Sequence, residues 1–393
     1  MTDGREVVAH IVTRCVAGAG GVAVRGAVSL DPTRYRSILV TGTREGPLLD
    51  RARAHGVEVV VVPRLVSPIS PVNDALALRR LVSVLRAHRV SIVHTHSAKG
   101  GALGRVAGRW VGVRKVVHTL HGFPFHDFQG KVPHAIYVTI ERALGARTDD
   151  LLAVGTAVAV EALRRGIARP GQVHTIGPAV DPPTVVLTDE SRAAARTLLG
   201  IDQDVPVVGT VGRLDFQKAP EVMVEALRLM RHHAVLVWAG DGELAARTRE
   251  VAAASGLADR VLLLGNRTDV PAILPAFDVF AMASRFEGLP CAIVEAQQCG
   301  VPVVATAVNA VTDVVVPGES GLLVPPERPA LLAEALDYAL DHPDQARRWS
   351  EVARGHLGDR YDPATLGRLL DTLYAAEPEP HPTRRPVAGS VAR

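Results

Sequence analysis

An apolar run, a turn containing glycine and proline, and a second apolar run do most to limit the folds open to this chain. Residues 278–283 (Asp-Val-Phe-Ala-Met-Ala) predict a buried strand. Glu-Gly-Leu-Pro at 287–290 predicts a turn whose proline lies in the first helical turn, where its missing N–H costs nothing. We expect a helix over 289–298 that ends at Gly300, and a further strand from residue 301. This order of elements is typical of a parallel α/β sheet, which binds ligands at the carboxyl ends of its strands.

Two carboxylates lie in this stretch, eight residues apart. Glu287 is in the turn and Glu295 is about two helical turns further along, so each can face a different end of one ligand. A lone pair at this spacing would more often be a solvated turn residue and a residue on a helix face. Within this strand, turn and helix we favour a ligand site, because the start of the helix also offers free amides and the positive end of its dipole.

The same alternation of strands and helices runs through the chain. Further strands are expected at 7–12, 37–41, 57–62, 91–94, 116–119, 151–154, 173–176, 205–210, 234–239 and 261–264. At 393 residues the chain is long enough for two hydrophobic cores, and the adjacent prolines at 182 and 183 mark the boundary between them. A glycine-rich loop at 15–22 lets a ligand approach the backbone closely. This loop does not complete the G-x-G-x-x-G of dinucleotide-binding enzymes, which disfavours a dehydrogenase.

The stretch from Ser284 to Ala305 resembles the signature of glycosyltransferase family 4, the retaining sugar transferases of the GT-B fold. The likeness extends to Gly-Arg-Leu at 212–214, followed by Lys218, and to the segment 177–181. The resemblance implies an α/β protein with two Rossmann-like parallel-sheet domains that face each other across a cleft, and a C-terminal helix that returns to the first domain. The expected limits are 1–182 for an acceptor-binding domain, 183–358 for a nucleotide-sugar-binding domain, 359–376 for the returning helix and 377–393 for a proline-rich disordered tail.

Two cations at the carboxyl end of a predicted strand indicate a diphosphate site. Arg213 can act as a planar fork and Lys218 as a point charge, although two surface cations would also explain the pattern. The resemblance implies that these side chains hold the leaving diphosphate together with the amides near Leu289 and Cys291. No metal ion is expected to take part.

The resemblance also implies roles for the two carboxylates. Glu295 would accept ribose hydroxyls, and Glu287 would accept sugar hydroxyls and fix the ring without acting as a covalent nucleophile. The catalytic set is then His121, Arg213, Lys218 and Glu287. The expected donor-binding set is Gly20, Gly21, Gly212, Arg213, Lys218, Asn266, Arg267, Gly288, Leu289, Cys291 and Glu295.

Histidines follow two neighbouring strands of the first predicted domain. His94 and His96 belong to one strand end, and His118 and His121 belong to the next. Their spacing is not that of a helical zinc site, no cysteine joins them and carboxylates are distant in the sequence, so we expect hydrogen bonds to a polar ligand instead of a metal. The resemblance places His121 beside the reacting sugar when the domains close.

Charge is distributed unevenly along the chain. Residues 1–182 contain 24 Lys and Arg against 13 Asp and Glu, which leaves 20 against 28 for the rest. The basic half includes a predicted helix at 73–89 and a run of cations interleaved with apolar residues. These cations are Arg79, Arg80, Arg86 and Arg89 in the helix, and Arg105, Arg109, Arg114 and Lys115 in the run. Such a surface suits a lipid-phosphate-linked acceptor and peripheral contact with the inner face of a membrane. A soluble acceptor, with the charge only solvating the surface, stays open, and nucleic acid is not expected as a partner.

Composition gives the expected compartment. No apolar run approaches the roughly 20 residues that a membrane span needs, and the first six residues are polar, so neither a span nor a secretory leader is expected. Three cysteines without metal-ligand spacing favour a reducing, cytoplasmic compartment.

The preferred hypothesis is a retaining glycosyltransferase. It would move a hexose-type sugar from a nucleotide diphosphate sugar, with a UDP-sugar favoured and no other cofactor, to an acceptor hydroxyl in polysaccharide or glycolipid assembly. The alternatives are transfer to a soluble natural product, a GT-B sugar-nucleotide epimerase or phosphorylase, and a non-catalytic sugar-binding scaffold. Arg213, Lys218, Glu287 and Glu295 together favour the transferase.

Overall fold

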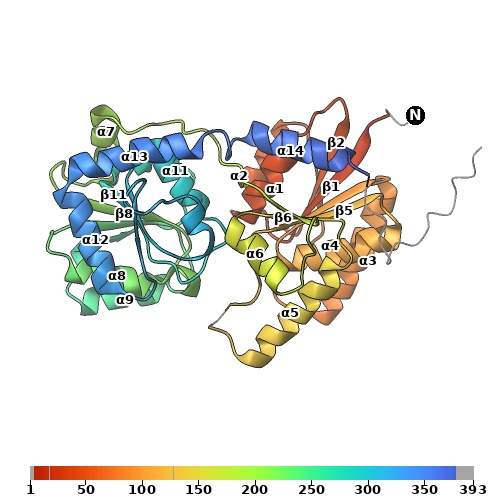
Figure 1. Cartoon of the computed structure of the whole chain (residues 1–393), viewed down its shortest axis with the longest axis horizontal. Helices are drawn as coiled ribbons and strands as arrows, with labels where there is room; N and C mark the ends of the chain where they lie inside the picture. Colours follow the sequence, from red (N-terminus) through yellow and green to blue (C-terminus); the bar gives the residue numbers. More distant parts are fainter. Residues whose placement is uncertain (1–3, 17, 127, 378–393) are drawn as a thin grey trace, which may run out of the picture. The chain divides into compact units, whose positions relative to one another are not determined.

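The computed structural model describes residues 4–16, 18–126 and 128–377 of the chain. The chain forms two compact units (Figure 1). The first unit comprises residues up to Ala179 and residues from Arg360 onward, and the second runs from Val180 to Asp359. The proline-rich tail predicted at 377–393 lies, apart from residue 377, outside the described residues.

The first unit is built on a seven-stranded parallel sheet in the order β3-β2-β1-β4-β5-β6-β7. Its strands are β1 (Glu6–Val12), β2 (Tyr35–Thr41), β3 (Glu58–Val61), β4 (Ile92–His96), β5 (Lys115–Leu120), β6 (Asp150–Ala153) and β7 (Val173–Thr175). Its helices are α1 (Ala19–Val28), α2 (Pro47–Ala54), α3 (Pro71–Ala87), α4 (Ala98–Val111), α5 (Lys131–Gly145), α6 (Thr156–Arg164) and α14 (Pro363–Ala375). Helices cover both faces of the sheet, which is why the central strands β4 and β5 are buried along their whole length although they contain polar residues. Ile11 of β1 packs with residues of α3 and α4 on one face, and Val12 packs with residues of α1 and α2 on the other.

The last helix, α14, completes the first unit. Gly367 of α14 comes so close to Ser29 that a Cβ would lie 2.5 Å from the Ser29 carbonyl oxygen. Tyr374 is fully buried, and its hydroxyl hydrogen-bonds to His94 Nδ1 at 2.5 Å. The predicted return of the C-terminal helix to the first domain is therefore confirmed.

The second unit is built on a six-stranded parallel sheet in the order β10-β9-β8-β11-β12-β13. Its strands are β8 (Val207–Val211), β9 (Val235–Ala239), β10 (Val261–Leu263), β11 (Val279–Met282), β12 (Val303–Thr306) and β13 (Leu322–Val324). Its α-helices are α7 (Asp189–Leu199), α8 (Pro220–Leu229), α9 (Ala245–Ala254), α10 (Val270–Ile273), α11 (Cys291–Cys299), α12 (Pro329–Asp341) and α13 (Pro343–Leu357). Short 3-10 helices are η1 (Phe216–Lys218), η2 (Ala258–Arg260), η3 (Leu274–Ala276) and η4 (Asn309–Asp313). Its core buries the indole rings of Trp238 and Trp349.

The strand order reverses once in each sheet. In the first unit the reversal lies between β1 and β4, and in the second it lies between β8 and β11. Open α/β sheets bind ligands at such a reversal, outside the carboxyl ends of the strands, because the loops there diverge to opposite faces. The fold therefore points to two places, the loops after β1 and β4 and the loops after β8 and β11.

One helix in the stretch around Glu287 starts later than the sequence predicted. The helix expected from residue 289, with its proline in the first turn, begins at Cys291. Pro290 is its N-cap, with an extended ψ of 101°, so the proline precedes the helix. Among the helices within the described residues, none combines the length and the hydrophobicity that crossing a membrane requires.

Candidate functional site

The loops after β8 and β11 meet around the carboxylate of Glu287 in the second unit. This side chain is only 5% exposed. Its Oε1 accepts from Lys218 Nζ at 2.6 Å and from Ser284 Oγ at 2.6 Å, and its Oε2 accepts from Gln217 Nε2 at 2.9 Å. The Glu287 backbone N–H donates to Asn309 Oδ1 at 2.9 Å. The carboxylate is therefore fixed in position, and Lys218 balances its charge. We call these five residues the Glu287 network.

Local backbone geometry explains how Lys218 reaches the carboxylate. A Cβ at Gly212 would lie 3.0 Å from Lys218 Cε, so glycine leaves the room along which the lysine side chain runs. The Gly212 carbonyl oxygen accepts from Trp238 Nε1 at 2.8 Å, and Asp215 caps the 3-10 helix η1 by accepting from the Lys218 backbone N–H at 3.2 Å. Ala219 follows in the left-handed region, with φ 48°, a conformation that glycine adopts at lower cost.

The other predicted donor-binding cations have partners of their own. Arg213 is 68% exposed and ion-pairs with Asp215 at 2.8 Å. Arg267 donates from Nε to Asp269 Oδ1 at 2.7 Å, and Asn266 is exposed. These contacts lie outside the Glu287 network, so Lys218 is the predicted cation that the structure joins to Glu287.

The start of α11 supplies the remaining predicted donor residues. Gly288, Cys291 and Glu295 are half-buried and Leu289 is buried. No side chain caps this end of the helix, so no N-cap side chain takes up its first-turn amides. Amides at a helix start suit an anion such as a diphosphate.

Sequence reasoning did not assign Gln217, Ser284 and Asn309 to the site. Ser284 lies three residues before Glu287 and could have been found as a neighbour in the same turn. Gln217 and Asn309 are 70 and 22 residues from Glu287 in the sequence, and only the strand order brings their loops together.

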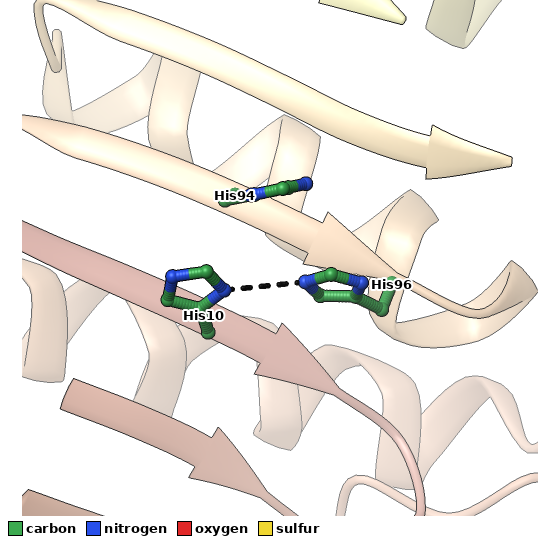
Figure 2. Close-up of side chains that lie close together, drawn as sticks. All are labelled: His10, His94 and His96. Atoms are coloured by element: carbon green, nitrogen blue, oxygen red, sulfur yellow. Dashed lines mark hydrogen bonds between the residues drawn. The ribbon is translucent and has the colours of Figure 1, made fainter. Parts of the chain in front are cut away.

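The strand reversal of the first unit carries buried histidines (Figure 2). His10 of β1 lies opposite His94 of β4, and His96 follows two residues later, so the three side chains lie on one face of the sheet. His10 Nδ1 is 3.3 Å from His96 Nε2, and the rings of His94 and His96 stack with centroids 4.4 Å apart. His96 Nδ1 is in turn 3.2 Å from Nε2 of His121, the residue predicted to contact the sugar. His10 was not among the predicted site residues.

Burial keeps these imidazoles neutral. Desolvation is the main cause, and it lowers the pKa to about 3 for His10 and His121 and well below the usual value for His94, His96 and His118. The positive charge of Arg25 adds to the lowering of the His121 pKa. At neutral pH each ring therefore carries one N–H and one bare nitrogen.

The glycine-rich loop predicted after β1 is partly helical. Helix α1 begins at Ala19, so Gly20 and Gly21 lie in its first turn, and both are buried. A Cβ at Gly20 would lie 2.9 Å from the Cα of Cys15, so glycine is needed for close packing of the chain on itself. The prediction of an open loop at these two glycines is wrong, because the helix starts earlier than expected.

The basic run in the first unit is not a cationic surface, which corrects the sequence-based interpretation. Each member has an acidic partner: Arg105 with Glu141 at 3.0 Å, Arg109 with Asp149 at 2.8 Å, Arg114 with Glu6 at 2.8 Å and Lys115 with Asp150 at 3.0 Å. Arg105 and Lys115 are buried. The arginines predicted on and after α3, namely Arg79, Arg80, Arg86 and Arg89, are exposed.

Comparison with known proteins identifies the family. Residues 16–183 match the model described as Glycosyltransferase Family 4, and residues 191–356 match the model described as Glycosyl transferases group 1. The chain is 33% identical over 284 residues to the Escherichia coli protein named UDP-Gal:alpha-D-GlcNAc-diphosphoundecaprenol alpha-1,3-galactosyltransferase, across 71% of this chain and 73% of that protein. The chain belongs to glycosyltransferase family 4. This family 4 chain is also 32% identical to the D-inositol 3-phosphate glycosyltransferase of Salinispora tropica, across 78% of this chain and 68% of that one.

Solved structures show the fold of this family 4 enzyme. Anabaena HepE, solved in complex with UDP and glucose, superposes with a TM-score of 0.83 at 21% identity, across 95% of this chain and all of that one. WaaG, a glycosyltransferase involved in lipopolysaccharide biosynthesis, superposes with a TM-score of 0.77 at 19% identity, across 94% of this chain and all of that one. The predicted GT-B fold and the predicted activity, a retaining transferase that uses a nucleotide sugar, are confirmed.

Proposed function

We propose that this enzyme transfers a hexose from a UDP-sugar to a sugar hydroxyl on a lipid-linked diphosphate acceptor, at the cytoplasmic face of a membrane. Residues 183–358 form the donor-binding domain in this proposal, and residues 1–182 form the acceptor-binding domain. The Escherichia coli relative, whose name gives a UDP-galactose donor and a diphosphoundecaprenol acceptor, supports both parts.

The Lys218–Glu287 pair carries the donor side of the proposal. Lys218 and Arg213, with the amides at the start of α11, hold the leaving diphosphate, since cations and helix-start amides both stabilise developing negative charge. Glu287 accepts sugar hydroxyls and keeps its position through Ser284 and Gln217. No step in this scheme requires a metal ion.

The remaining predicted residues keep supporting roles in the proposal. Glu295 accepts the ribose hydroxyls, and the backbone at Asn266 and Arg267 borders the base. His121 of the first unit contacts the transferred sugar. Gly288 lets the ligand approach the backbone, and Gly212 leaves the space along which the Lys218 side chain runs.

An apolar face on α5 supports a membrane-bound acceptor. Val132, Ile136 and Ile140 lie four residues apart along the helix and are 71%, 54% and 45% exposed. They form an open, shallow apolar surface together with Lys131 at the start of the helix. We call these four residues the α5 face. The acidic residue of this helix, Glu141, is buried, so the exposed charge beside the apolar row is basic, as expected for contact with anionic lipid.

Transfer assays test this proposal. The full chain is incubated with UDP-galactose or UDP-glucose and with either a polyprenyl diphosphate-linked N-acetylglucosamine or inositol phosphate, and labelled product is counted. We expect transfer to the lipid-linked acceptor, and at least tenfold less with Glu287→Gln, since one charge-assisted contact is lost. Transfer to inositol phosphate alone would show that the acceptor is soluble, as the name of the Salinispora relative indicates for that protein.

A further inference from the structure

Two buried imidazoles, His10 and His96, and the half-buried imidazole of His121 form a continuous row of nitrogen contacts in the first unit. His10 Nδ1 meets His96 Nε2 at 3.3 Å, as the dashed line in Figure 2 shows, and His96 Nδ1 meets His121 Nε2 at 3.2 Å. A neutral imidazole has one donor and one acceptor nitrogen, so His96 must donate to one neighbour and accept from the other. Only two proton arrangements satisfy both contacts.

The environment of His10, at one end of this row of histidines, decides between the two proton arrangements. His10 Nε2 is buried and hydrogen-bonds to no described residue. The ring lies beside α1 and α14, where a Cβ at Gly26 would be 3.4 Å from both His10 Cε1 and Leu370 Cδ1. If Nε2 carried the proton, a donor would be buried without an acceptor, and buried N–H groups without a partner are rarer in proteins than unpaired acceptors. The His10 proton therefore lies on Nδ1 and is donated to His96.

The same order of protons continues to His121. His96 accepts at Nε2, so its own proton lies on Nδ1 and is donated to His121 Nε2. We infer that His10 and His96 are positioning residues, which hold His121 in the tautomer that carries its proton on Nδ1. His121 then offers a fixed N–H donor to an oxygen of the substrate. That last step rests on the proposed role of His121, whereas the tautomer follows from the contacts alone.

A metal ion shared by His10, His94 and His96 is the competing arrangement. Their ligand nitrogens lie within 4.8 Å of one another, and the 3.3 Å between two of them suits zinc bonds of about 2.0–2.1 Å. His94 argues against it, because its Nε2 already contacts Thr119 Oγ1 at 2.7 Å and its Nδ1 contacts Tyr374 Oη at 2.5 Å. Both ring nitrogens of His94 are therefore already engaged by protein hydroxyl groups, which leaves His10 and His96 as the remaining pair.

Nuclear magnetic resonance of the full chain, labelled with ¹⁵N-histidine, tests the tautomer directly. Long-range ¹H–¹⁵N spectra at neutral pH distinguish a protonated ring nitrogen from a bare one, and the His121 signals are identified by their loss in His121→Gln. We expect a proton on His121 Nδ1 and a bare Nε2. A proton on Nε2 would overturn the inference. Binding of zinc to the wild-type chain, with shifts in the signals of His10, His94 and His96, would also overturn it.

Two variants of His96 separate positioning from packing. His96→Asn keeps an N–H near the Nδ1 position and so keeps the donor to His121, whereas His96→Gln places its amide toward His10 and loses that donor. We expect His96→Gln to lower kcat/KM about tenfold, the effect of one hydrogen bond, and His96→Asn to stay within about threefold. Equal losses in the two variants would overturn the role. If the wild-type chain transferred no sugar, the proposed function would fail, but the spectra would still decide the tautomer.

Discussion

Replacing Lys218 with methionine tests what balances the buried charge of Glu287. The Lys218 side chain is 15% exposed and that of Glu287 is 5%, so solvent screens the pair little. Removing one partner of a buried ion pair costs about 3–5 kcal/mol, because the other charge is left uncompensated. Ser284 and Gln217 still donate to the carboxylate in the variant, and each such bond offsets roughly 1 kcal/mol. We therefore expect the second unit to lose about 1–3 kcal/mol of unfolding free energy.

Urea unfolding followed by tryptophan fluorescence measures this loss. Trp238 and Trp349 are buried in the core of the second unit, so their emission reports on that unit. The control is the cycle of Lys218→Met, Glu287→Gln and the double variant, in which both charges are absent. We expect the double variant to regain about 2 kcal/mol relative to the sum of the single losses. Additive losses would mean that the 2.6 Å contact contributes no coupling, and the ion-pair argument would be refuted.

Four further outcomes are expected. The free energy of unfolding should fall as the pH drops from about 6.5 toward 3, by up to about 1.4 kcal/mol per pH unit for each buried histidine. The reason is that the pKa values of these histidines are lower in the folded chain than in the unfolded chain, so the unfolded chain takes up protons first. Urea unfolding at several pH values checks this, and a free energy of unfolding that does not change with pH would contradict it. Arg105→Met should destabilise the first unit by about 3–5 kcal/mol, since it leaves Glu141 buried and unpaired. In thermal melts, the double variant Arg105→Met with Glu141→Leu should lose less stability than Arg105→Met alone. Ile136→Ser should reduce sedimentation with anionic liposomes, whereas Val352→Ser, at an exposed position of the second unit, should not; equal behaviour would rule out the α5 face as the contact. Transfer should continue in EDTA, and loss of activity that manganese restores would show that the diphosphate needs an ion.

The fold could be predicted from the sequence because each of its signals is local. Apolar runs and glycine or proline boundaries lie within a few residues of one another, and they place the strands and helices. The order of protons through the buried histidines could not be predicted. His10 and His96 are 86 residues apart, and their contact exists only because β1 and β4 are neighbours at the strand reversal.

The charges of the site were only partly predictable, for a similar reason. Lys218 and Glu287 were each predicted as donor-site residues, but with different ligand groups as partners, and their mutual contact spans 69 residues. The interpretation of the basic run as a cationic surface was wrong, because spacing along the chain does not show which cations are buried and paired. Arg105 forms an ion pair with Glu141 on α5, and Lys115 forms one with Asp150 on β6.

The place of α14 in the chain has a consequence for biosynthesis. The first unit contains residues up to Ala179 and also residues after Asp359. The whole second unit is therefore translated before the last residues of the first unit. Until then His94 lacks the hydroxyl of Tyr374, and Lys115 lacks the carbonyl of Ala376 to which its ammonium group donates at 3.1 Å. A ribosome that stops before codon 363 would therefore release a chain that contains the whole second unit but lacks α14 of the first.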